Sequence, residues 1–195
     1  TGLNNNPGNT NDARDLQFAT AASMGRGTVT LNGRGFWLGT ANSADTAVIA
    51  AINVLEKGSY LNGGSGNSYY FGGAFTGSGT MTTALGNAFA YLTGDMTGFQ
   101  GAFSHTGDSL FTWAFGNNTE AVLNDGKLFG DGVVLKADGG TSQFKFSYTN
   151  DIILMNATVG AEGALNARVE QAGTGTLVLT QDNSCLLYTS PSPRD

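Results

Sequence analysis

Apolar and polar residues alternate along several short stretches of the chain. In "GTVTL", Val29 and Leu31 fall on one side of an extended strand, while Thr28 and Thr30 fall on the other. Successive side chains of a strand point to opposite faces, so an alternating stretch buries one face and exposes the other. Three further stretches share this alternation, with Phe111, Trp113 and Phe115, with Phe144, Phe146 and Tyr148, and with Leu177 and Leu179 on the inward side. The pattern predicts half-buried β-strands.

Glycine-rich turns separate these strands. Asn or Asp stands beside many of the glycines, as in "LNGRG", "LNGGSGN", "LNDGK" and "ADGGT". Glycine adopts positive φ at little steric cost, and Asn and Asp tolerate such turns better than most residues. These turns suit the hairpins of a β-sandwich as well as the corners of a coil, so they leave both architectures open.

A glycine phrase recurs at long intervals, and its period favours the coil. It occurs as "GRGTVTL" from Gly25, "GSGTMTT" from Gly77, "GDGVVL" from Gly130 and "GTGTLVL" from Gly173, with starts 52, 53 and 43 residues apart. A second phrase, F-x-G-A-F, occurs at 71–75 and again 28 residues later. Each long interval accommodates two solenoid rungs of about 20–27 residues. We therefore predict an all-β fold, a parallel β-helix (β-solenoid) over residues 13–184, with a β-sandwich as the alternative.

The stretch "DTAVIAAINVLEKG", residues 45–58, fits two structures. Asp45 suits a helix N-cap, Gly58 suits a helix end, and the apolar residues between them have helical spacing. The strand interpretation uses the alternation around Ile52 and Val54. We favour the strand because the surrounding sequence is strand-like, and the helix remains open.

Composition limits the partners of the chain. Only 12% of its 195 residues are charged, 30 are glycine, and the formal net charge is −6. A nucleic-acid-binding face needs clustered cations, whereas the nine Lys and Arg residues are scattered. The longest apolar runs, such as "IILM" at 152–155, are far shorter than the roughly 20 residues of a membrane-spanning helix. We expect neither nucleic acid binding nor a transmembrane segment.

The two ends of the chain differ from its middle. Residues 1–12, "TGLNNNPGNTND", are polar and are predicted to form a loop. The last eleven residues, 185–195, read "CLLYTSPSPRD", and their back-translation resembles a transposase sequencing adapter read in frame. We interpret them as an adapter-derived tail, so the natural chain is expected to continue beyond Ser184. Excluding the tail removes Cys185, the only cysteine, from the candidate chemistry.

The phrase "GTGTLVLTQDN" resembles the passenger-associated transport repeat, also called the autotransporter-associated β-strand repeat. That family's pattern is G-x-G-T-L-x-L-x-G-x-N followed by an aromatic residue. The matching positions are Gly173, Gly175, Thr176, Leu177, Leu179 and Asn183. Gln181 stands where the family has glycine, and "GSGTMTTALGN" is a looser version of the same pattern.

The resemblance implies a right-handed parallel β-helix, the passenger segment of a large exported bacterial surface protein. Such a segment is secreted or held at the cell surface, and members of the family sometimes end in an outer-membrane barrel. Here that barrel would lie downstream of Ser184. A chain without cysteine up to that point fits an exported bacterial protein that needs no oxidative folding.

Nucleotide and calcium binding lack their motifs. A dinucleotide site needs G-x-G-x-x-G between a strand and a helix, and a P-loop ends in Gly-Lys-Ser/Thr, but each G-x-G phrase here leads into a strand. The stretch "GGSGNSYYF" at 63–71 has the glycines of a calcium-binding β-roll, yet Ser68 stands where the carboxylate belongs. We predict a plain turn there and no cofactor or metal.

A hydrolase would depend on His105, the only histidine, with Asp108 and Ser109 beside it in "GAFSHTGDS". A general base needs a nucleophile and an orienting acid placed around it in space, which neighbours on one turn rarely provide. We interpret His105 as a solvated turn residue.

Glycan cleavage is the stronger enzymatic alternative, since it needs two carboxyl groups about 5–10 Å apart. The possible suppliers are Asp95, Asp108, Asp125, Asp131, Asp138 and Asp151, most of which stand beside Gly or Asn, as turn-forming Asp does. Trp37, Trp113 and the tyrosines could stack on sugars, although aromatics at strand spacing are more often core residues.

These observations predict a non-enzymatic, structural or adhesive segment with no catalytic, cofactor-binding or metal-binding residues. Its expected partners are surface glycans or host and environmental surfaces. A glycan-binding or glycan-cleaving β-helix domain is the alternative function.

Overall fold

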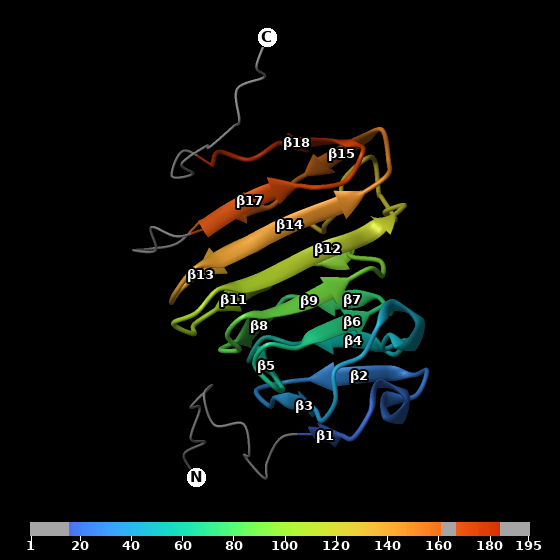
Figure 1. The fold of residues 1–195 in the computed structure, drawn as a ribbon. Helices are drawn as coiled ribbons and strands as arrows, with labels where there is room; N and C mark the ends of the chain where they lie inside the picture. Colours follow the sequence, from blue (N-terminus) through green and yellow to red (C-terminus); the bar gives the residue numbers. More distant parts are fainter. Residues whose placement is uncertain (1–15, 161–166, 184–195) are drawn as a thin grey trace.

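Parallel strands stack into a β-solenoid of about seven turns in the computed structural model, which describes residues 16–160 and 167–183 (Figure 1). Each of the fourteen pairings between named strands is parallel. A sandwich of antiparallel repeats is therefore wrong, and the predicted all-β parallel β-helix is confirmed. The predicted loop at 1–12 and the tail at 185–195 lie outside the described residues.

The strands form three faces. Face 1 is a seven-stranded sheet of β1 (Leu16–Phe18), β3 (Phe36–Leu38), β5 (Ser59–Asn62), β8 (Thr80–Thr83), β11 (Ala102–His105), β13 (Val134–Ala137) and β16 (Thr158–Val159). Face 2 contains β6 (Ser68–Phe71), β9 (Ala88–Leu92), β12 (Phe111–Thr119), β14 (Ser142–Tyr148) and β17 (Ala167–Gln171). Face 3 contains β2 (Thr28–Leu31), β4 (Ala51–Val54), β7 (Phe75–Gly77), β10 (Gly98–Phe99), β15 (Ile152–Met155) and β18 (Thr176–Leu179).

Face 3 is interrupted and then resumed. Residues 126–130 link its two sheets, because Gly130 N donates to Phe99 O (2.9 Å) and Leu128 N donates to Leu154 O (3.1 Å). Leu154 N in turn donates to Gly126 O (2.8 Å). The loop that contains this link lengthens one rung, so that Ala102 pairs with Val134, 32 positions on. The same insertion places Phe111 opposite Ser142, 31 positions on, whereas the pairs of the other rungs are 20–25 residues apart, as for Thr28 and Ala51.

The recurring glycine phrases do not occupy equivalent positions. The phrases at Gly77 and Gly130 lead into β8 and β13 on face 1, whereas those at Gly25 and Gly173 lead into β2 and β18 on face 3. Only the Gly77–Gly130 interval therefore spans two whole rungs. Each rung has three corners, and the same phrase can precede a strand at more than one of them.

The stretch 45–58 contains a strand. A single 3-10 turn, η2 (Ala44–Thr46), is capped by Ser43, and β4 follows it. β4 pairs with β2 on one side and β7 on the other, and Ile52 and Val54 are fully buried. These lateral contacts outweigh the helical spacing, so the favoured strand is confirmed and the helix alternative is wrong.

The strand alternation places most core residues correctly. Thr28 and Thr30 are exposed while Leu31 is buried, and Phe144 and Phe146 are buried. The half-buried prediction is wrong for β12, where the outward Thr112 and Ala114 are also buried. Their in-register neighbours are long: Ala114 stands between Tyr91 and Lys145, which cover it.

Buried phenylalanines form a continuous line of ring contacts, the aromatic spine, through the solenoid. Its members are Phe36, Phe71, Phe75, Phe103, Phe115 and Phe146, all at most 1% exposed. Successive ring centroids are 5.9, 6.0, 6.0, 5.4 and 5.0 Å apart. Aromatic pairs at such distances stabilise a core beyond the area they bury. The spine therefore connects rungs that share no hydrogen bonds.

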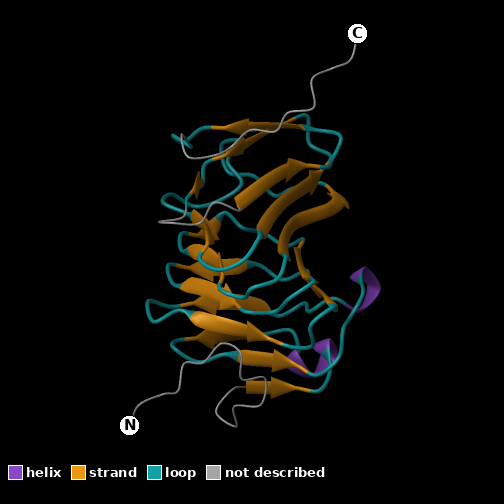
Figure 2. Cartoon of the chain, turned by 60° about the vertical axis from the view of Figure 1, so that its left-hand side comes forward, coloured by secondary structure: helices purple, strands orange, loops and turns teal. Residues whose placement is uncertain are grey.

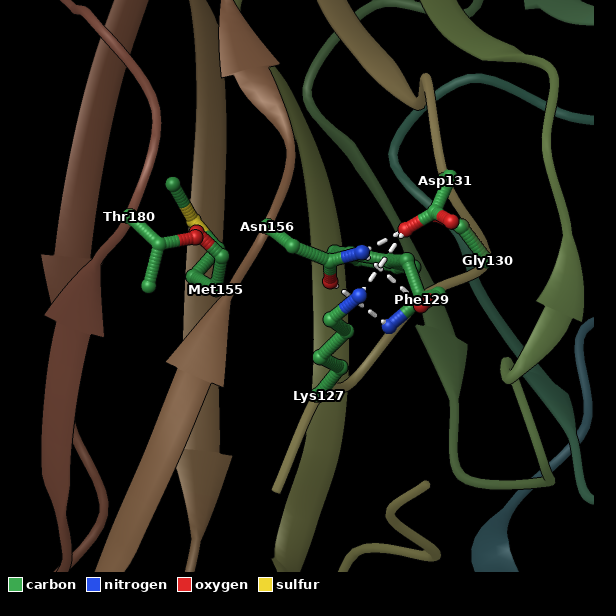
Figure 3. A network of polar contacts seen from close by, with 7 residues as sticks. All are labelled: Lys127, Phe129, Gly130, Asp131, Met155, Asn156 and Thr180. Atoms are coloured by element: carbon green, nitrogen blue, oxygen red, sulfur yellow. Dashed lines mark hydrogen bonds and ion pairs between the residues drawn. The ribbon is translucent and has the colours of Figure 1, made fainter. Parts of the chain in front are cut away.

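Asparagine side chains join neighbouring rungs where strands are missing. Asn156, 5% exposed, accepts a hydrogen bond from Phe129 N (3.1 Å) and donates to Phe129 O (2.9 Å) and Gly130 O (3.0 Å), holding the long loop (Figure 3). Asn42 bonds both backbone groups of Tyr70 in the same way. A side-chain amide carries one acceptor and two donors, so it can replace a backbone peptide of the missing strand.

We expect Asn156→Ala to lower the free energy of unfolding by about 3 kcal/mol, because it leaves buried backbone groups of the loop without partners. Urea denaturation followed by tryptophan fluorescence measures the change. Asn117→Ala is the matched control, since no hydrogen bond involves the Asn117 side chain within the described structure. Equal effects of the two substitutions would show that Asn156 does not anchor the loop.

Candidate functional site

His105 lies inside the coil and is fully buried, so the interpretation as a solvated turn residue is wrong. It ends β11, two positions after Phe103, and the strand alternation directs both side chains inward. Its Nε2 lies 3.1 Å from Leu85 O and its Nδ1 lies 3.4 Å from Ser142 Oγ. The ring also stacks on Phe111 at a centroid distance of 5.4 Å.

The environment of His105 favours the neutral imidazole. Burial lowers its pKa from the usual value of 6.5, and this outweighs the opposing effects of the Leu85 carbonyl and the Asp108 charge. A neutral ring with the proton on Nε2 donates to Leu85 O and accepts from Ser142 Oγ. Ser142 is itself fully buried. The pair therefore has the geometry of a satisfied core contact, and no substrate can reach His105 without opening the coil.

The lowered pKa makes stability depend on pH. In the unfolded chain His105 takes up a proton below about pH 6.5, while the folded chain resists protonation until a lower pH. The contribution of His105 to the free energy of unfolding is therefore fully present above pH 6.5. It is lost as the pH decreases towards the folded-state pKa, with a slope of up to about 1.4 kcal/mol per pH unit.

Urea denaturation between pH 5 and 8 measures this slope, and His105→Gln is expected to flatten it. The comparison isolates one group because His105 is the only histidine. A slope that survives the substitution would assign the pH dependence to other groups.

The six candidate aspartates are at turns or beside local partners. Asp95 accepts from Thr97 N (2.8 Å) and Thr97 Oγ1 (2.7 Å), and Asp138 accepts from Ser104 Oγ (2.6 Å). Asp131 pairs with Lys127 at 3.1 Å (Figure 3). The other three, Asp108, Asp125 and Asp151, lie in connections between strands. Three of the six thus have local structural roles.

The aromatic candidates divide between the core and the surface. Trp113 is buried inside β12, and Trp37 is half-buried on β3. Sequence analysis missed a cluster on the outside of face 2, the outer aromatic row, formed by Tyr70, Phe89 and Tyr91. Tyr70 and Tyr91 stack at 4.3 Å with an interplanar angle of 6°, and Phe89 lies 5.8 Å from Tyr91. The sequence feature that could have indicated this row is the 21-residue spacing of the two tyrosines, which equals one rung of the solenoid.

The glycine-rich stretch at 63–67 connects β5 to β6 as a turn. Gly64 N donates to the Tyr69 hydroxyl at 2.5 Å, so a phenol holds the turn. Among the described residues, no group of three or more His, Cys, Asp and Glu side chains is placed to hold a metal ion.

A cleft of about 790 Å³ opens where face 2 lacks strands. In the first two rungs the positions before β2 and β4 are occupied by η1 (Ala21–Met24) and η2, which lie on one side of the molecule (Figure 2). The residues lining the cleft are Thr20, Ala21, Ala22, Gly25, Arg26, Thr40, Ala41, Asn42, Asp45, Thr46, Ala47 and Ile49. No sequence motif pointed to this cleft.

Comparison with known proteins finds no matching family model, no similar curated protein and no similar solved structure. In the described parts of the chain, no helix has the length and apolar character needed to cross a membrane.

Proposed function

We propose that this chain is a structural segment of a large exported bacterial surface protein, similar to an autotransporter passenger, and that it acts as a stalk or adhesive scaffold. The observation that carries the proposal is the aromatic spine, which runs from β3 to β14 and is enclosed by three hydrogen-bonded faces. Such a core resists bending and extension, because its ring contacts join successive rungs along the solenoid. The resemblance of the Gly173 phrase to the transport repeat supports export.

Surface display tests this proposal. The full chain with Cys185→Ser would be fused between a secretion signal and an outer-membrane translocator barrel in a Gram-negative host. We expect external antibody to label the chain, because a chain with no disulfide can pass a narrow pore unfolded. The matched control adds Asn53→Cys and Thr76→Cys, whose disulfide would lock two rungs before translocation. Periplasmic retention of both versions would contradict the passenger-like role.

Glycan binding is the second candidate, and the outer aromatic row is the observation that favours it. Its three rings are half-buried on a sheet exterior, where aromatic edges and hydroxyls can contact a polysaccharide. We expect Tyr91→Ala to abolish any retardation of the protein in polysaccharide-containing native gels. Tyr60→Ala, on face 1, is the control. If polysaccharide in the gel does not slow the unsubstituted protein, glycan binding by the outer aromatic row is ruled out.

A further inference from the structure

The cleft beside η1 and η2 has a lining of mixed chemistry. Five small or aliphatic side chains form its apolar part: Ala21, Ala22, Ala41, Ala47 and Ile49. Ile49 is 48% exposed, which is high for such a side chain. Ligand sites are typically recesses of about 300–1,000 Å³ with an apolar lining and a few polar groups. The cleft falls within this range.

The neutral polar side chains of the lining already have partners within the fold. Thr40 Oγ1 donates to Ala19 O (3.1 Å), and Asn42 bonds the backbone of Tyr70. Thr46 Oγ1 accepts from Ser43 N (2.9 Å). These groups shape the cleft but have little capacity left for a ligand.

The two charged side chains differ from the rest. Within the described residues, neither Arg26 nor Asp45 has a hydrogen bond or ion pair, and both are exposed. One unpaired cation and one unpaired anion therefore line a single recess with an apolar wall.

We propose that this cleft binds a short zwitterionic peptide with small apolar side chains. The Arg26 guanidinium receives the terminal carboxylate, since its planar fork matches a carboxylate in two parallel hydrogen bonds. Asp45 receives the terminal ammonium, and the alanines and Ile49 contact the side chains. A ligand with only negative charge would satisfy Arg26 and be repelled by Asp45. This binding activity goes beyond the proposed scaffold role, which requires no small ligand.

Tri-alanine is the probe, because it carries both terminal charges and only small apolar side chains. We would titrate it into the ¹⁵N-labelled full chain at low salt and follow amide shifts at residues 20–26 and 40–49. Both charged groups are exposed, so each ion pair contributes little, and we expect a dissociation constant of about 1–5 mM. N-acetylated, C-amidated tri-alanine lacks both charges and is expected not to bind.

Variants assign the binding to the two charges. Arg26→Ala and Asp45→Ala are each expected to weaken tri-alanine binding about two- to fivefold, the effect of losing one exposed ion pair. The exchange Arg26→Asp with Asp45→Arg is expected to restore it, because a zwitterion can bind in the opposite direction. Arg34→Ala, an exposed arginine outside the lining, is the matched control. The proposal is overturned if the blocked peptide binds equally, if the single variants bind as the unsubstituted chain does, or if glucuronate binds in place of tri-alanine.

Discussion

Gly79→Ala is expected to destabilise the solenoid by about 3 kcal/mol, the upper end of the usual cost of overpacking, because the added Cβ meets fixed backbone. A Cβ at this position would overlap the carbonyl oxygen of Leu55 in the rung below. Gly79 also donates to Val54 O (3.0 Å), so moving it away would lengthen a hydrogen bond between rungs. A Cβ at Gly175, in the best-formed glycine phrase, would likewise overlap the carbonyl oxygen of Asn150.

Gly27→Ala is the matched control, since Gly27 ends the G-x-G of another phrase. Apart from its own chain neighbours, no described atom lies within 4 Å of the site where its Cβ would be, and β2 is the edge strand of face 3 among the strands that the structure describes. We expect a change of less than about 1 kcal/mol, because alanine restricts the unfolded chain and meets no obstacle in the folded one. Equal losses at positions 27 and 79 would contradict the stacking explanation of the glycine phrase.

Phe103→Ala is expected to lower the free energy of unfolding by about 3–5 kcal/mol, the usual cost of removing a buried phenyl ring. Phe103 is fully buried and belongs to the aromatic spine, where its ring contacts those of Phe75, Trp113 and Phe115. The cavity would separate the two halves of the spine.

Chemical denaturation of Phe103→Ala and Phe89→Ala provides the comparison. Phe89 is half-buried on the outside of face 2 and contacts Tyr91. Its loss is expected to cost about 1 kcal/mol, as one exposed aromatic contact is worth that order. If Phe89→Ala were the more damaging of the two, the spine would not be the main source of cohesion.

The parts of the fold that follow from short-range alternation could be predicted from the sequence. Leu31 and Phe144 face inward because their neighbours along the strand are polar. His105 carried the same signal, since it stands two positions after Phe103, but the adjoining Thr106 and Gly107 indicated a turn. The turn begins only after His105, which is the last residue of β11.

Features that depend on neighbouring rungs could not be predicted in this way. Ala114 is buried because Tyr91 and Lys145 lie in register with it, 23 and 31 positions away in the sequence. The cleft has a related origin, since it forms where two rungs have 3-10 turns in place of strands on face 2. Neither Arg26 nor Asp45 belongs to a motif, so only the fold brings them to one recess.

In-register disulfide formation tests the parallel stacking most directly. Asn53 of β4 and Thr76 of β7 are paired positions, and their side chains are 3.2 Å apart. Adjacent strands are about 4.8 Å apart, which suits a disulfide, whereas positions two rungs apart are separated by about 9.5 Å, beyond its reach.

In a Cys185→Ser background, Asn53→Cys with Thr76→Cys is expected to cross-link quantitatively on mild oxidation of the folded protein. Thr30→Cys with Thr76→Cys, two rungs apart in the same row, is expected to remain reduced. Mass spectrometry distinguishes the outcomes. Failure of the first pair, or equal cross-linking of both, would contradict the solenoid.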